Sequence, residues 1–425
     1  MRPSRPPRLD QPVQNWALDP MRLVGALLVG FAAFAYSNAP PGIAQRVQGD
    51  GPWPFWTTAI WVAGYGASLL VCLARPWSCL RLAISAPSFV ALVLLAALTA
   101  QWSINPIETL KAAIGFGATT AGGIALGLFC LRRQAQLIAA VLGLLAIASL
   151  LLIVLYPAWG QHRFDEFDGA WRGLWFQKNG FAQMMVVGIS ACLGIVIAGP
   201  EAGEEPRSLR VWALAGAALF AFLVIGSTSK TGLLGMTAAM ATAAMIAFVR
   251  SGPVSMAATL YAGIVMSALL TLGVFLFPDL AFKLVGREAS LTGRTDIWAE
   301  IELLSRSRFW TGFGYGAFWL AESAPLATIT TDLDFQPASA HNSWTDLSIH
   351  FGLPGVLLVA LGFCGIAVRA ALRLARDPAA AYPLILLTGL LAMSATETMF
   401  AEKLSIIWMA IVAIGVRLAR APQTL

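Results

Sequence analysis

Apolar segments about 17 to 25 residues long recur along almost the whole chain, and they limit its possible folds more than any other feature. The chain is 58% hydrophobic and only 12% charged, whereas a water-soluble domain carries roughly twice that charged fraction. The alternating ten-residue pattern of an outer-membrane β-barrel is missing. We therefore expect an all-α, polytopic membrane protein.

About twelve segments are expected to span the membrane. They cover residues 22–36, 56–74, 84–101, 110–131, 136–156, 180–198, 210–226, 231–249, 254–277, 347–368, 380–399 and 403–419. The first could instead be the core of a signal peptide, although we favour an uncleaved helix. The expected organisation is a disordered cytoplasmic tail at 1–20, a bundle of about nine helices at 21–277, a catalytic loop at 278–345 and three further helices at 346–420.

Lys and Arg residues are distributed unevenly between alternate loops. With the N-terminus in the cytoplasm, sixteen of them fall on the inner side and four in the short outer loops. Because cytoplasmic loops carry an excess of these residues, both termini are expected inside. The eight remaining cations lie in two outer segments, 157–179 and 278–345. This exception is expected if their side chains bind an anionic ligand there.

Neither a disulfide framework nor a metal site is predicted. The five cysteines form no CxxC pair and fall in or beside apolar spans: Cys72, Cys79, Cys130, Cys192 and Cys364. Asp332 and Asp334 imitate the DxD metal motif of soluble glycosyltransferases, but in an acidic loop a solvated pair is favoured. The net charge of +6 follows from membrane topology, so nucleic acid is not an expected partner.

The first outer segment contains HRFDEFDGAWRGLWFQKNG at 162–180. Arg172 and Lys178 are flanked there by aromatic residues of the kind that sit at the lipid headgroup level. Such a pair could hold a phosphate whose lipid tail remains in the bilayer, or it could be an interfacial anchor. Lys230, in STSKTG, is a second candidate phosphate contact, with an ordinary loop lysine as the alternative.

The long loop supplies further cations, including Arg287 and Arg294. From about Thr295 an amphipathic helix is expected, and Arg294 lies at its N-terminal end, where backbone amides favour an anion. Its predicted apolar face consists of Ile297, Ile301 and Leu304. GFGYGAFW at 312–319 lacks the context of a nucleotide-binding loop and predicts a tight turn that lets backbone approach a ligand.

His341 lies in ASAHNSW, where the chain re-enters the membrane. An imidazole can accept a proton near neutral pH, and the cations on the same face favour a catalytic base over a structural histidine. Glu397, in TETMF at the outer end of the eleventh predicted span, could orient one of these groups. An ordinary helix-end carboxylate is an equal alternative.

Three spaced motifs carry a resemblance to a known family. WRGLWFQKNG, SLTGRTDIW followed by GFGYGAFW, and AHNSW resemble elements of the O-antigen ligase and polysaccharide polymerase superfamily, with a particular likeness to ExoQ-like exopolysaccharide production proteins. The likeness covers about residues 100–415. It implies a metal-independent glycosyltransferase of the GT-C kind, in which Arg172 and Arg294 contact the diphosphate of an undecaprenyl diphosphate donor and His341 acts as base. Gln177 departs from the pattern, since relatives often carry histidine or threonine there.

We therefore expect a multi-pass protein of the bacterial inner membrane with a periplasmic active site and no cofactor. It would transfer a glycan from an undecaprenyl-diphosphate-linked donor to an acceptor sugar hydroxyl, as a polymerase of exopolysaccharide or O-antigen. A ligase that joins the glycan to lipid A-core is one alternative, and a transporter or flippase of lipid-linked sugars is another. Membrane lipids and other polysaccharide-assembly proteins are further expected partners. The expected substrate-binding residues are Lys178, Asn179, Lys230, Arg287, Asn342 and Glu397.

Overall fold

The computed structural model describes residues 20–48, 54–163, 166–200, 206–252, 294–333 and 335–420. The predicted ninth span, Arg287 and Asp334 lie outside these residues. Within them every extended regular element is a helix, and strand-type pairing is limited to an isolated bridge between Gln161 and Trp171. The expected all-α class is confirmed.

The helices follow the predicted apolar segments closely. In chain order they are α1 (Pro20–Ala35), α2 (Ala39–Gln48), α3 (Phe55–Ala74), α4 (Pro76–Ser85), α5 (Pro87–Leu98), α6 (Pro106–Leu126), α7 (Leu131–Leu155), α8 (Pro157–Gly160), α9 (Lys178–Ala198), α10 (Pro206–Gly226), α11 (Lys230–Val249), α14 (Arg294–Ser305), α15 (Ala324–Leu333), α16 (Ser343–Leu374), α17 (Ala381–Ser394) and α18 (Ile406–Ala419). The eleventh predicted span is shorter than expected, because α17 ends at Ser394. Glu397 consequently lies in the connection to α18.

Six of the described helices are long and apolar enough to cross a membrane: α3, α7, α9, α10, α11 and α16. The number rises to eight if two bent pairs, α1 with α2 and α4 with α5, each count as one span. The α17 and α18 helices are apolar but shorter. A polytopic membrane protein is therefore confirmed, whereas the count of twelve spans is not.

Helices α9 and α18 form the centre of the bundle. The α9 helix packs against α7, α10, α11 and α17. Nearly every residue of α18 is buried, which is how a helix that is apolar on all sides is accommodated. Trp408 of α18 packs its ring against Phe89 and Phe116, at centroid distances of 5.6 and 5.3 Å. This central packing fixes both ends of the α17–α18 connection.

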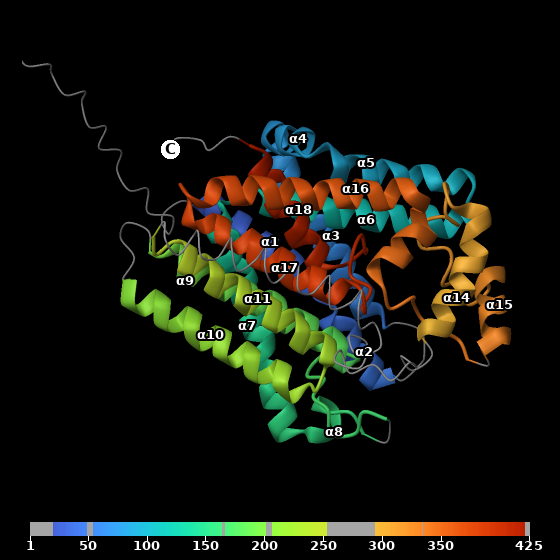
Figure 1. The fold of residues 1–425 in the computed structure, drawn as a ribbon, viewed down its shortest axis with the longest axis horizontal. Helices are drawn as coiled ribbons and strands as arrows, with labels where there is room; N and C mark the ends of the chain where they lie inside the picture. The colour runs from blue at the N-terminus through green and yellow to red at the C-terminus, as the bar shows by residue number, and fades with distance from the viewer. Residues whose placement is uncertain are drawn as a thin grey trace, which may run out of the picture.

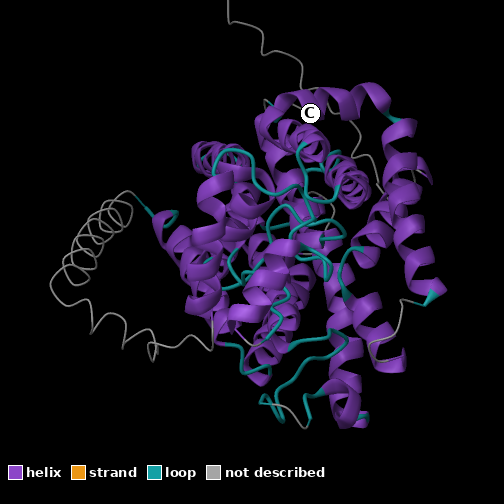
Figure 2. Ribbon diagram, turned by 90° about the vertical axis from the view of Figure 1, so that its right-hand side faces the viewer, coloured by secondary structure: helices purple, strands orange, loops and turns teal. Residues whose placement is uncertain are grey.

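Helices α14 and α15 lie together at one end of the bundle, away from the end near which the chain terminates (Figure 1). Figure 2 looks onto this end, where loops gather between the surrounding helices. Ile297 and Ile301 are buried there in a cluster with Phe313, Phe318 and Ile329. The predicted apolar face of the helix that follows Arg294 is confirmed, since it holds α14 against the glycine-rich turn and α15.

The glycine-rich turn crosses α16 at a kink. Gly352 has a φ of 66° inside α16, and the Leu353 amide donates to the carbonyl of Phe309 at 2.9 Å. A Cβ atom added at Gly312, whose φ is 62°, would lie 2.7 Å from the carbonyl oxygen of Ile349. A left-handed glycine is therefore required at this crossing. The expected tight turn is present, and at Gly312 its backbone approaches α16.

Candidate active site

Three helices, α9, α11 and α16, begin around the connection between α17 and α18. Asn179 is the second residue of α9 and Ser343 the first of α16, and Arg294 is the first described residue of α14. The α11 helix begins beside them, with Ser229 as its N-cap accepting a hydrogen bond from Gly232 N at 3.1 Å. Helix N-termini carry unpaired backbone amides and the positive end of the helix dipole. The loop-rich end of the bundle therefore concentrates positive potential.

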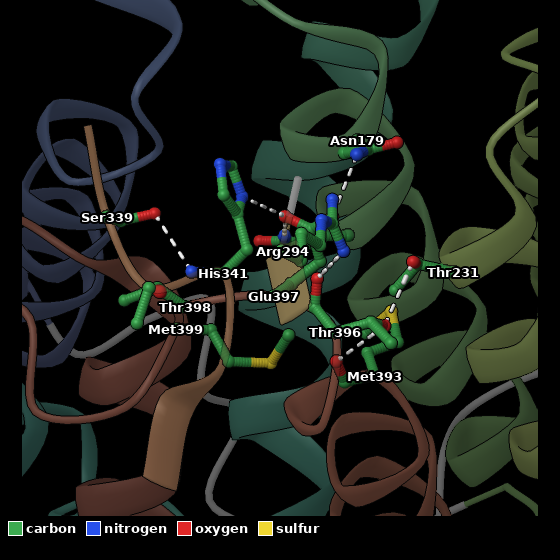
Figure 3. A network of polar contacts seen from close by, with 12 residues as sticks. Asn179, Thr231, Arg294, Ser339, His341, Met393, Thr396, Glu397, Thr398 and Met399 are labelled. Atoms are coloured by element: carbon green, nitrogen blue, oxygen red, sulfur yellow. Dashed lines mark hydrogen bonds and ion pairs between the residues drawn. The ribbon is translucent and has the colours of Figure 1, made fainter. Parts of the chain in front are cut away.

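Glu397 is the centre of the polar contacts at this place, and only 6% of its surface is exposed. Its Oε1 atom accepts hydrogen bonds from Asn179 Nδ2 at 2.8 Å and Arg294 Nη2 at 3.3 Å. Its Oε2 atom accepts one from Gln183 Nε2 at 3.3 Å and lies 4.0 Å from His341 Nδ1. Arg294 and His341 thus approach the same carboxylate (Figure 3). We call these five residues the Glu397 cluster.

The backbone around Glu397 is held as firmly as its side chain. The carbonyl of Thr396 accepts a second hydrogen bond from Arg294, through Nη1 at 2.6 Å. Ser343 Oγ donates to the carbonyl of Glu397 at 2.7 Å and accepts from Met399 N at 3.1 Å. The connection between α17 and α18 is thereby fixed to Arg294 of α14 and to the first residue of α16.

Lys230 lies between two residues that contact this region. Ser229 Oγ donates to Asn179 Oδ1 at 2.8 Å, and Thr231 Oγ1 lies 3.0 Å from Thr396 Oγ1. The start of α11, including Lys230, is therefore fastened next to the Glu397 cluster. Sequence spacing could not predict that the start of α11 lies beside Glu397, because Thr231 and Thr396 are 165 residues apart.

His341 is held in a left-handed backbone conformation, with a φ of 48°. A non-glycine residue in this region costs free energy, and such residues concentrate at functional sites. Its amide donates to Ser339 Oγ at 3.3 Å, and 29% of its side chain is exposed. The next residue, Asn342, caps α16 by accepting from Trp344 N and Thr345 N at 3.0 and 3.2 Å.

Arg172 lies in the segment that leads into α9, and Lys178 is the first residue of that helix. Lys178 Nζ is 4.2 Å from the ring centroid of Phe167, and its backbone directly precedes Asn179 of the Glu397 cluster. Arg172 interacts electrostatically with Arg46 of α2, whose guanidinium donates to the carbonyl of Trp175. From the sequence alone, Arg46 is only one of the four cations in the short outer loops. Because those loops carry few cations, its presence there is the one indication that it contacts this region.

Gln183 is a second residue that sequence analysis missed. It follows Asn179 by one helical turn, so both side chains lie on the same face of α9 and reach the same carboxylate. Asp332 of the DxD pair is exposed, and its partner is outside the described residues. Within the described ranges, no group of three or more His, Cys, Asp or Glu side chains is arranged to hold a metal ion.

Comparison with known proteins bears directly on the motif resemblance. Residues 215–360 match the family model described as O-antigen ligase, and this region contains Lys230, Arg294 and His341. The predicted resemblance to the O-antigen ligase superfamily is confirmed. The chain is also similar to the exopolysaccharide production protein ExoQ of Rhizobium meliloti strain 1021, with 25% identity over 287 residues. That alignment spans 64% of this chain and 62% of the relative.

The O-antigen ligase model matches part of the chain, and the alignment with ExoQ covers less than two thirds of that protein. Arg172 and Glu397 lie outside the matched family region. Glu397 is therefore assigned to the site from its contacts with Arg294 and His341, and Arg172 from the motif WRGLWFQKNG.

Proposed function

We propose that this chain is an undecaprenyl-diphosphate-dependent glycosyltransferase of the bacterial inner membrane, acting at its periplasmic face. It would transfer a glycan from the lipid-linked donor to a hydroxyl group of an acceptor sugar, as a polysaccharide polymerase. The observation that carries this proposal is the convergence of three helix N-termini, Arg294 and His341 around Glu397 at one end of the bundle.

The diphosphate would bind where the positive potential is concentrated. Its negative charge grows as it leaves the anomeric carbon, so fixed positive groups at that place stabilise the transition state. The contacts of Arg294 with Thr396 and Glu397 use two of the five N–H groups of a guanidinium, and further N–H groups can serve a phosphate. Lys230, Lys178 and Arg172 are the proposed additional phosphate contacts, and these cations would serve in place of a metal ion.

His341 would act as the general base. Its Nδ1 atom faces Glu397, so Nε2 is the nitrogen left to accept the proton of the acceptor hydroxyl. Glu397 would stabilise the imidazolium that forms and hold Arg294 in place at the same time. This gives Glu397 an orienting role, and Asn179 and Gln183 would fix the carboxylate by donating to it.

The Glu397 cluster favours an enzyme over a transporter of lipid-linked sugars. A transporter requires polar groups along a path through the middle of the membrane. Here Arg294 and His341 contact the same carboxylate, at the N-termini of α9, α11 and α16. This is the arrangement expected for chemistry at one membrane face.

Polymerisation and ligation use the same chemistry. The family match and the ExoQ similarity favour different ones of these two reactions. The name of the family model favours a ligase, and the name of the ExoQ relative favours exopolysaccharide production. The glycan profile of a deletion strain separates them. Loss of long polymer is the expected result and indicates a polymerase, whereas long polymer that remains on its lipid carrier would indicate a ligase.

A further inference from the structure

A cavity of about 250 Å³ lies next to the Glu397 cluster. The segment that carries Glu397 continues directly into its wall, because Thr398, Phe400, Glu402 and Lys403 all line it. Successive Cα atoms are about 3.8 Å apart, so the cavity begins one residue from the carboxylate that faces His341. The rest of the wall consists of Ala112, Tyr315, Gly316, Asp346, His350 and Ala401.

The charged residues that line the cavity differ in whether their side chains already have hydrogen-bond partners within the protein. Asp346 is saturated by the chain itself, since it accepts from Trp319 Nε1 at 2.8 Å, from Ala340 N at 3.3 Å and from the Thr398 hydroxyl. In contrast, within the described residues the side chains of Glu402 and Lys403 make no hydrogen bond or close ion pair. These two groups are therefore available to a ligand.

Burial of Glu402 raises the pKa of its carboxyl to about 8, and the neighbouring charges of Asp346 and Glu397 act in the same direction. Lys403 opposes the effect. At neutral pH the carboxyl is therefore mostly protonated, so it can both donate and accept a hydrogen bond. A sugar hydroxyl has the same two requirements.

Part of the cavity wall is aromatic and held by contacts with other parts of the chain. The ring of Tyr315 stacks on Phe351 at a centroid distance of 5.1 Å, and its hydroxyl donates to the carbonyl of Ala401 at 2.8 Å. Ala401 and Leu404, on either side of Glu402 and Lys403, both have positive φ values, of 53° and 59°. The Leu404 amide is held in turn by Thr119 Oγ1 at 2.9 Å. Both ends of this strained turn are fixed by side chains from other parts of the fold.

We propose that this cavity binds the sugar ring of the acceptor glycan that carries the attacking hydroxyl group. The assignment rests on the proposed transferase function. The volume is below the roughly 300–1,000 Å³ of pockets for drug-sized molecules, which suits a single sugar unit. A wall with two carboxyl groups and one lysine does not suit a diphosphate.

The connections between the two sites favour the acceptor over the donor sugar. The Ala340 amide bonds to Asp346 in the cavity wall, and the next residue is His341. On its other side, His341 faces Glu397 and, through it, Arg294. The proposed base is therefore connected on one side to Arg294, which would bind the leaving group, and on the other to the wall of the cavity in which the acceptor would lie.

The test uses the full-length protein in nanodiscs. The donor is lipid-linked oligosaccharide extracted from a strain that lacks this protein, and the acceptor is the same oligosaccharide released from its lipid by mild acid. Lys403→Met removes a polar contact, and Ala112→Leu fills the cavity from the α6 wall. Donor affinity is measured separately for each variant by equilibrium binding, which also shows that the variant is folded.

Lys403→Met is expected to raise the acceptor KM by about tenfold or more, as loss of a hydrogen bond to a charged group does. Ala112→Leu should raise it by a similar factor, because its side chain occupies space that the sugar ring would need. Donor Kd should stay within about twofold of the wild-type value. Lys111→Met removes an exposed lysine elsewhere on α6 and should change neither constant. An unchanged acceptor KM in both variants, or a weakened donor affinity, overturns the assignment. A wild-type protein that transfers nothing rejects the proposed function itself, and with it the acceptor site.

Discussion

Replacing Glu397 by Gln should separate donor binding from the chemical step. The change keeps the size of the side chain but removes the negative charge that Arg294 and His341 share. If Glu397 stabilises the imidazolium of His341, its charge matters only once the proton has moved. Donor binding should therefore be unchanged or tighter, because the site becomes more positive towards the diphosphate, whereas the rate of transfer should fall.

The size of the effect follows from the distance between Glu397 Oε2 and His341 Nδ1, which is 4.0 Å. Two unit charges at that distance attract by about 1 kcal/mol in bulk water and about 4 kcal/mol at an effective dielectric constant of about 20. His341 is partly exposed, so its environment lies between these limits. The single-turnover rate should consequently fall between about fivefold and about 10³-fold.

The assay is single turnover of the lipid-linked donor in nanodiscs, with donor affinity measured in parallel. Glu302→Gln is the matched control, because Glu302 pairs with Arg306 at 3.1 Å but both side chains are more than 70% exposed. Exposed pairs contribute little, so this variant should stay within about twofold of wild type. A Glu397→Gln protein that transfers at the wild-type rate, or that loses donor affinity while its chemical step is normal, refutes the proposed role.

Four further predictions follow from the same structure. His341→Ala should lower the turnover rate by roughly 10²-fold to 10⁴-fold and leave donor affinity nearly intact. Arg294→Ala should weaken donor binding and turnover together, and Arg294→Lys should restore them only in part. Donor titrations and single-turnover rates of these variants check both. A cysteine in place of exposed Thr328 should react in intact spheroplasts with a membrane-impermeant thiol reagent, and labelling only after membrane disruption would contradict the periplasmic placement. Chelators and Asp332→Asn should leave turnover within a few-fold; inhibition that a divalent ion reverses would require a metal. Because the pKa of Glu402 is raised from 4.5 to about 8, wild-type stability should fall as pH rises through that interval, and Glu402→Gln should reduce this dependence in thermal unfolding.

Sequence patterns predicted the parts of the site that depend on local structure. The apolar periodicity after Arg294 predicted the helix that follows this residue, and the polar loop identified His341 just before another helix. Patterns could not place Asn179 on Glu397, because the two residues are 218 positions apart and no periodicity relates them. The cavity beside Glu402 was missed for the same reason, since its wall combines α6, α16, the glycine-rich turn and the α17–α18 connection.

The convergence of helix N-termini has a simple origin in the predicted topology. If the N-terminus is cytoplasmic, every even-numbered span enters the membrane from the outer face, so each begins there. The helices α9, α11 and α16 correspond to the sixth, eighth and tenth predicted spans, and all three begin beside the Glu397 cluster. Their dipoles then point their positive ends at the same face on which the sequence places the excess of outer cations. An anionic lipid-linked donor would meet both contributions at once. The positive-inside count and the helix starts therefore agree on the end of the bundle at which we propose that the diphosphate binds.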